Sequence, residues 1–185
     1  EYGYSTMGYE VSGCLGVKFA VGEEHDAFAM VGDGGFIMLH SELLTAVQEH
    51  KRIIVCLFDN ASFGCINNLQ VGQGNATLCT ELRYRNPETG KHDGKFISVD
   101  FAGIARSYGA KGITVRTLGE LENAIAEAKA TEGGPVLIDI KVLPKSMTDG
   151  YGAWWRVGCP EVGGTEANRA AWENHLAHER DARKY

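Results

Sequence analysis

The sequence predicts a doubly wound α/β fold, in which a mostly parallel sheet carries helices on both of its faces. Three apolar segments predict buried strands, at residues 27–31, 53–58 and 135–142, because continuous apolar runs are typical of strands that are covered on both faces. Segments with helical signals alternate with them, and this alternation favours a parallel sheet. Ligands of such folds bind beyond the carboxyl ends of the strands, so polar residues at those ends are candidate site residues.

The other elements are predicted from helical periodicity and from helix caps. Ser5 and Asp100 are suited to cap helices, and Thr117 with Glu120 matches a capping box, in which each side chain binds the other residue's free backbone N–H. The single charge of the last buried strand, Asp139, is expected near the end of that strand. The sequence thus predicts a fourth strand at 112–116 and helices at 5–20, 36–49, 64–71, 100–108, 117–130 and 165–182.

The predicted helix at 36–49 carries an apolar face whose members are spaced at helical intervals, namely Phe36, Leu39, Leu43, Leu44 and Val47. A different pattern occurs at 72–95, which is polar, contains glycine and has no periodicity. Segments of this length without regular structure are uncommon within a domain and are either functional or mobile.

The composition argues against several classes of function. The 185 residues fit one domain, and the net charge of −6 with scattered basic residues argues against nucleic acid as a partner. No apolar stretch reaches the roughly 18 residues that a membrane span needs, and no secretory signal is recognised. Five cysteines, an odd number without a CxxC pair, predict free thiols in a reducing compartment, which favours the cytoplasm.

The segment Val31–Phe36 contains the most informative motif of the chain. It predicts the end of a buried strand, a tight turn containing Gly32, Gly34 and Gly35, and the start of a helix. Turns of this kind hold phosphates in α/β proteins. The middle residue is Asp33, an anion, which would repel a diphosphate unless a divalent cation lay between them. The turn therefore predicts a metal ion.

A second set of oxygen ligands follows the next buried strand. Asn60 offers an amide oxygen and Ser62 a backbone carbonyl, and with the carboxylate of Asp33 they form a ligand set suited to Mg²⁺ or Ca²⁺. The alternative is two ordinary turns that use Asp-Gly and Asp-Asn because those residues suit turns. A P-loop is excluded because GxxxxGK[ST] is absent, and a dinucleotide fingerprint would need Gly or Ala at Ile37.

These motifs resemble those of the thiamine-diphosphate-dependent enzymes. Gly32-Asp33-Gly34, followed by Asp59-Asn60, is similar to the family's GDG and Asn-Asn motif, although Asp59 replaces the first Asn. Residues 5–8 resemble a Gly-Thr-Met-Gly turn of the acetolactate synthase group, with Ser5 in place of the first Gly. The resemblance implies Asp33, Asn60 and Ser62 as metal ligands and a cofactor-binding set of Ser5, Thr6, Met7, Gly32, Gly34, Gly35, Asn60, Ser62, Gly64 and Cys65.

A closer resemblance connects the chain with one subgroup of this family, hydrolases that open a polyhydroxylated cyclic diketone by cleaving a carbon–carbon bond in inositol catabolism. The segments that carry it are 1–5, 38–43, 58–60 and 63–70. The resemblance implies thiamine diphosphate and Mg²⁺ as cofactors and a homo-oligomer. It also implies that the activating Glu belongs to a pyrimidine-binding domain outside this chain, so that the chain is a fragment that is inactive alone.

The resemblance divides the chain into a diphosphate- and Mg²⁺-binding domain at 1–145 and a C-terminal segment at 146–185. This segment contains Tyr151, Trp154 and Trp155 followed by a helix, and it is expected to pack on the domain or on a partner.

Three polar side chains are candidate substrate contacts. His40 lies shortly after the glycine turn, but a histidine satisfied in the core or at an interface is an alternative. Asn67 and Gln70 follow the predicted metal loop and could bind a polyhydroxylated ring, or they could lie on a plain helix surface. Cys65 is disfavoured as a nucleophile because no Cys–His arrangement is visible in the sequence.

Two other functions remain open from the sequence. One is an acetolactate-synthase-like domain that joins or decarboxylates 2-oxo acids, which the segment 65–70 disfavours. The other is a noncatalytic α/β module that binds a nucleotide, for which thiamine diphosphate would not be needed.

Overall fold

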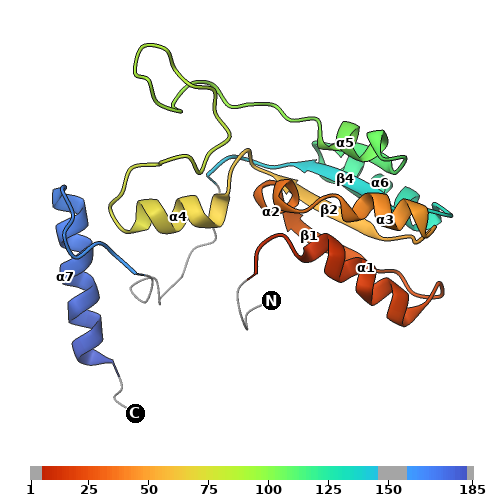
Figure 1. Cartoon of the computed structure of the whole chain (residues 1–185), viewed down its shortest axis with the longest axis horizontal. Helices are drawn as coiled ribbons and strands as arrows, with labels where there is room; N and C mark the ends of the chain where they lie inside the picture. The colour runs from red at the N-terminus through yellow and green to blue at the C-terminus, as the bar shows by residue number, and fades with distance from the viewer. Residues whose placement is uncertain (1–5, 146–157, 183–185) are drawn as a thin grey trace. The chain divides into compact units, whose positions relative to one another are not determined.

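The computed structural model describes residues 6–145 and 158–182 (Figure 1). The contacts divide the chain into two units, which are considered separately below. The first unit comprises Glu1–Ser62 and Ile97–Pro144, and the second comprises Phe63–Phe96 and Lys145–Tyr185. The functional division at residue 145 stays a prediction.

The first unit contains a four-stranded parallel sheet, as the sequence predicts. Its strands are β1 (Phe28–Gly32), β2 (Ile54–Asp59), β3 (Lys111–Val115) and β4 (Val136–Lys141). They lie in the order β1-β2-β4-β3, and every pairing is parallel. Gly32 is in register with Phe58, and Asp59 with Lys141. The carboxyl ends of β1, β2 and β4 therefore meet at one edge of the sheet.

Helices cover both faces of this sheet, which confirms the predicted fold class. Alternate residues of β2 divide between two apolar clusters, with Val55 and Leu57 in one and Ile54 and Cys56 in the other. The helices of the first cluster are α1 (Glu10–Val21), α2 (Asp33–Met38), α3 (Glu42–Gln48) and α5 (Phe101–Ser107), and that of the second is α6 (Leu118–Ala130) (Figure 1).

The predicted caps of two helices are confirmed. The Asp100 carboxylate accepts a hydrogen bond from the backbone N–H of Gly103 at the start of α5. Both bonds of the capping box between Thr117 and Glu120 are present at the start of α6. Asp139 lies two residues before the end of β4 and is fully buried.

The prediction of one helix at 36–49 is wrong, because the chain forms two helices there. Leu39 has φ −152° and ψ 76°, which ends α2 before α3 begins. Because of this break, the apolar residues of the segment do not all lie on one buried helix face. Phe36 and Leu43 are fully buried, whereas Leu39 and Leu44 are exposed. The first of these helices begins at Asp33 rather than Phe36, so both glycines after Asp33 lie in its first turn.

The first helix of the chain also begins later than predicted. It begins at Glu10, because Gly8 has a φ of +88°, which a right-handed helix does not accept. A Cβ at Gly8 would lie 3.1 Å from the Cβ of Met38, so the turn before α1 packs closely on α2. Ser5, the predicted cap, lies outside the described residues, as do Tyr151, Trp154 and Trp155.

The second unit contains α4 (Gly64–Gly72) and α7 (Glu166–Asp181). The buried Asn168 joins them, since its Nδ2 donates to the backbone carbonyl of Gln73 and to Oδ1 of Asn75. Among the described residues, none of the helices is long and apolar enough to cross a membrane. All five cysteines are free, as predicted.

Candidate metal and cofactor site

The ends of two neighbouring strands bring the predicted metal ligands together. Asp33 is the first residue of α2 and directly follows β1, while Asn60 directly follows β2. Because β1 and β2 are paired in parallel, with Gly32 opposite Phe58, both residues lie at the same edge of the sheet. The strand order therefore places a carboxylate and an amide side by side at the edge where α/β proteins bind ligands.

The backbone N–H of Ser62 connects these two side chains. It donates to Oδ2 of Asp33 at 2.9 Å and to Oδ1 of Asn60 at 3.1 Å. The hydroxyl of Ser62 also donates to Oδ1 of Asn60, at 2.8 Å. Two side-chain oxygens thus converge on one backbone group, and the loop 60–62 holds them in place.

The carboxylate of Asp33 is fully buried. Burial raises its pKa to about 7; the backbone N–H of Gly34, 2.8 Å from Oδ1, opposes the rise, and the nearby carboxylate of Asp59 adds to it. Within the described part of the chain, no cationic side chain is paired with Asp33. A buried carboxylate in these surroundings favours binding of a proton or of a metal cation.

Asp59 has a different partner, which sequence reasoning missed. Its Oδ2 accepts a hydrogen bond from Nζ of Lys141, and its Oδ1 accepts one from the backbone N–H of Ala61. Lys141 also forms an ion pair with the buried Asp139, at 2.9 Å. The signal in the sequence is that Asp139 and Lys141 are two residues apart and so lie on the same face of β4. Lys141 therefore neutralises Asp59 and leaves Asp33 as the carboxylate available to a metal ion.

The residues present fit a magnesium diphosphate group. No group of three or more His, Cys, Asp or Glu side chains suited to hold a metal occurs in residues 6–145 and 158–182, so a metal here would depend on one carboxylate, neutral oxygens, phosphate and water. Mg²⁺ accepts such a set. Gly32 is exposed, and a Cβ added to it would meet nothing within 4 Å. The open space beside this turn is where a ligand would fit.

The structure says less about the remaining predicted cofactor contacts. Thr6 and Met7 are exposed in the turn before α1, and Ser5 lies outside the described residues. Gly64 and Cys65 begin α4, which belongs to the second unit. Their contacts with a diphosphate therefore stay predictions.

His40 is held by aromatic neighbours in the first unit. Its Nδ1 forms a hydrogen bond with the hydroxyl of Tyr108 at 3.0 Å, and its ring stacks on Phe36 with the ring centroids 5.3 Å apart. It lies in the break between α2 and α3 and is half-buried. These contacts favour the interpretation of His40 as a satisfied core histidine, and a substrate contact by it stays a prediction.

Asn67 and Gln70 hold a loop against α4. The buried Asn67 donates to the hydroxyls of Thr77 and Thr80, at 3.0 and 2.8 Å. Oε1 of Gln70 accepts from the backbone N–H of Leu78 at 2.9 Å. A binding role of Asn67 toward substrate would require these bonds to break, whereas Gln70 also lines a cavity.

Comparison with known proteins identifies the family and the fold. Residues 1–140 match the family described as thiamine pyrophosphate enzyme, C-terminal TPP binding domain. The whole chain is 52% identical to 3D-(3,5/4)-trihydroxycyclohexane-1,2-dione hydrolases of Geobacillus thermodenitrificans and of Clostridium botulinum, and it spans 29% and 28% of their lengths.

Two solved structures share the fold. The thiamine diphosphate-dependent 4-hydroxybenzoylformate decarboxylase of Rhodococcus jostii RHA1 gives a TM-score of 0.62 at 17% identity, over 76% of this chain and 24% of that one. Benzoylformate decarboxylase of Polynucleobacter necessarius gives 0.58 at 22% identity, over 75% and 23%.

Proposed function

Because the chain belongs to the thiamine pyrophosphate enzymes, as their C-terminal cofactor-binding domain, we propose that its first unit holds the diphosphate of the cofactor through a Mg²⁺ ion. The observation that carries this proposal is the convergence of Asp33 and Asn60 on the N–H of Ser62. The metal ligands would be the Asp33 carboxylate, the Asn60 amide oxygen and the backbone carbonyl of Ser62, with phosphate and water completing the set.

The substrate that we propose is trihydroxycyclohexane-1,2-dione, opened by hydrolysis of a carbon–carbon bond in inositol catabolism. Identity of 52% over the whole chain with the hydrolases named for this compound supports the proposal. Since the chain spans less than a third of these relatives, the pyrimidine-binding domain and the activating Glu are expected elsewhere in a homo-oligomer. We place the enzyme in the cytoplasm, which the five free thiols support.

The residues of this chain have a binding and orienting role in the proposed reaction. When bound, thiamine diphosphate supplies the electron sink that carbon–carbon cleavage needs. The metal ion would neutralise the diphosphate and fix its position, which orients the rest of the cofactor. Lys141 neutralises the negative charge of Asp59, so the negative charge that would face the metal ion is that of Asp33.

The test is a substrate panel on the full-length protein with thiamine diphosphate and Mg²⁺. We expect ring opening of trihydroxycyclohexane-1,2-dione at an enzyme-like rate, and little turnover of pyruvate or benzoylformate. Residues 1–185 alone are expected to show no turnover, because we expect the activating Glu elsewhere in the full-length protein. Turnover of a 2-oxo acid in place of the cyclic dione would contradict the proposed substrate while leaving the cofactor site intact.

A further inference from the structure

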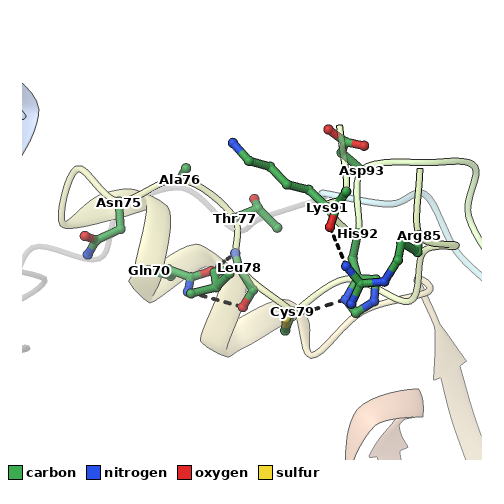
Figure 2. A pocket seen from close by; sticks show the side chains of 11 residues that line it. Gln70, Asn75, Ala76, Thr77, Leu78, Cys79, Arg85, Lys91, His92 and Asp93 are labelled. Atoms are coloured by element: carbon green, nitrogen blue, oxygen red, sulfur yellow. Dashed lines mark hydrogen bonds between the residues drawn. The ribbon is translucent and has the colours of Figure 1, made fainter. Parts of the chain in front are cut away.

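The second unit contains a cavity of about 590 Å³. None of the residues that line it belongs to the proposed cofactor and metal set. The lining consists of Gln70 on α4, the following loop at 75–79, and Arg85 with the segment 90–93 (Figure 2). Two of the lining residues touch, since Sγ of Cys79 lies 3.6 Å from Nδ1 of His92. This is a Cys–His pair that the sequence did not reveal.

The backbone on both sides of Cys79 is fixed to α4. Oε1 of Gln70 accepts from the backbone N–H of Leu78 at 2.9 Å and from the hydroxyl of Thr80 at 3.0 Å. The backbone carbonyl of Thr80 in turn accepts from the N–H of Phe63 at 2.8 Å. Cys79 lies between these anchors, is exposed, and has a φ of +57°. Its side chain is therefore presented to solvent from a fixed position.

His92 is presented from a hairpin-like loop that closes on itself. The N–H of Tyr84 donates to the carbonyl of Lys95 at 3.0 Å, and the N–H of Asn86 donates to that of Lys91 at 2.8 Å. The loop thus has internal support on both sides of His92. Figure 2 shows the imidazole directed toward Cys79 across the cavity lining.

The charges of the lining favour an anionic occupant. Arg85 and Lys91 contribute two cations, and Asp93 is the one carboxylate among the lining residues. Oδ1 of Asp93 already accepts a hydrogen bond from the hydroxyl of Thr89 at 2.8 Å. An exposed thiol beside an imidazole and near cations is the environment in which a cysteine becomes nucleophilic.

We propose that Cys79 and His92 form a reactive pair that undergoes thiol–disulfide exchange with a small anionic disulfide held by Arg85 and Lys91. His92 takes the thiol proton through Nδ1, and the sulfur of Cys79 forms a bond with one sulfur of the disulfide. The disulfide bond breaks, and its other sulfur leaves as a thiolate that receives the proton. Cys79 is oxidised to a mixed disulfide, and the released thiol is the reduced product.

The experiment uses oxidised glutathione as the anionic probe on the full-length protein, without added cofactor. After timed incubation, free thiols are alkylated and the mixed disulfides are quantified for each cysteine by peptide mass spectrometry. Cys65, which is also exposed, is the internal comparison. We expect Cys79 to react at least about tenfold faster than Cys65, and the replacement His92→Asn to remove this advantage. The replacement His25→Asn, at an exposed histidine outside the cavity, should leave it unchanged.

A comparison of an anionic with a neutral disulfide provides a second, independent test. The replacement Lys91→Gln should slow the reaction with oxidised glutathione and leave that with the neutral bis(2-hydroxyethyl) disulfide unchanged. The wild-type comparison of Cys79 with Cys65 needs no variant, so a folding defect in any variant leaves the test valid. Equal rates at Cys79 and Cys65 in the wild-type protein would overturn the proposal, as would an unchanged rate in a folded His92→Asn variant.

Discussion

The carboxylate of Asp33 and the amide oxygen of Asn60 accept hydrogen bonds from the same backbone N–H, that of Ser62, at 2.9 and 3.1 Å. The two residues come from different strand ends, and the parallel pairing of β1 with β2 brings them together. Oxygens that converge in this way, with one buried carboxylate that has no cationic partner in the described part of the chain, are of the kind that divalent cations accept as ligands. The proposed cofactor site rests on this relationship.

The loop residues Asn60 and Ser62 should respond differently to replacement by alanine. Asn60→Ala removes a proposed metal ligand, so the affinity for Mg²⁺ and thiamine diphosphate should fall by about tenfold or more. Ser62→Ala keeps the backbone carbonyl and removes only a hydroxyl that occupies Oδ1 of Asn60, so the affinity should change little. Titration calorimetry of both variants checks this, and equal losses would contradict the assignment of the carbonyl of Ser62.

Replacing each of two glycines by alanine should distinguish an effect on cofactor binding from an effect on stability. Gly32→Ala places a methyl group in open space beside the turn, so the melting temperature should hold while cofactor binding weakens. Gly35→Ala places its Cβ 3.2 Å from Cγ2 of the buried Val31, and since Val31 has little room to move in the core, the melting temperature should fall. Thermal unfolding and calorimetry of the two variants measure both effects. Undiminished binding by Gly32→Ala would argue against a ligand at this turn.

Replacing Lys141 by Met should destabilise the first unit strongly. The change leaves Asp59 and the fully buried Asp139 without their cation, and breaking such a buried pair costs about 3 kcal/mol or more. Lys51→Met is the control, because its ion pair with Glu23 is much more exposed and should contribute little to stability. Urea unfolding of the variants gives both free energies.

The loss caused by Lys141→Met should depend on pH. Burial raises the pKa of Asp139, and Lys141 opposes that rise. Without Lys141, the pKa of folded Asp139 rises further above its unfolded value. A carboxyl group whose pKa is raised in the folded state leaves stability unaffected below its unfolded pKa, lowers stability progressively as the pH rises from the unfolded to the folded pKa, and lowers it by a constant amount above that. The difference from wild type should therefore shrink as the pH is lowered from about 7 to about 5, and a difference independent of pH would contradict this account.

Asn67→Ala should act on stability rather than on substrate binding. The variant leaves the hydroxyls of Thr77 and Thr80 without their donor, which should cost about 1–3 kcal/mol and speed proteolysis of the loop after α4. Asn68→Ala, at the half-buried neighbouring position, should have a smaller effect. If instead Asn67→Ala raised KM for the cyclic dione with unchanged stability, the predicted substrate contact would be supported.

The sheet and several helix ends could be predicted because their signals are local. Buried strands carry continuous apolar runs, and Asp100 and Thr117 form caps with groups three residues away. The break after α2 could not be predicted, because it depends on tertiary contacts. His40 lies in the break and pairs with Tyr108, which is 68 residues further along the chain. The apolar spacing at 36–49 continues across the break and gives no sign of it.

The proximity of Asp33 and Asn60 could be predicted because strand ends that are close in a parallel sheet are marked by motifs in the sequence, while their role as metal ligands stays a prediction. Lys141 was missed, since its partner Asp59 is 82 residues away and only the pairing of β2 with β4 brings them together. Cys79 and His92 were missed for a related reason. They lie in a segment without periodicity, where side-chain contacts follow from the path of the loop and not from spacing.

The role of Asp33 in cofactor binding can be measured by calorimetric titration of the full-length protein with thiamine diphosphate, with Mg²⁺ and then with EDTA, compared with Asp33→Asn. The isosteric variant keeps the shape of the buried side chain and removes its charge. Because its amide nitrogen cannot accept one of the two backbone N–H bonds that Asp33 accepts from Gly34 and Ser62, thermal unfolding checks that the variant is folded. If Asp33 holds the metal ion, the wild-type protein binds the cofactor in a metal-dependent manner and the variant does not. Equal, Mg²⁺-dependent binding by both proteins would contradict the role of Asp33, and no binding by the wild-type protein would contradict the cofactor site itself.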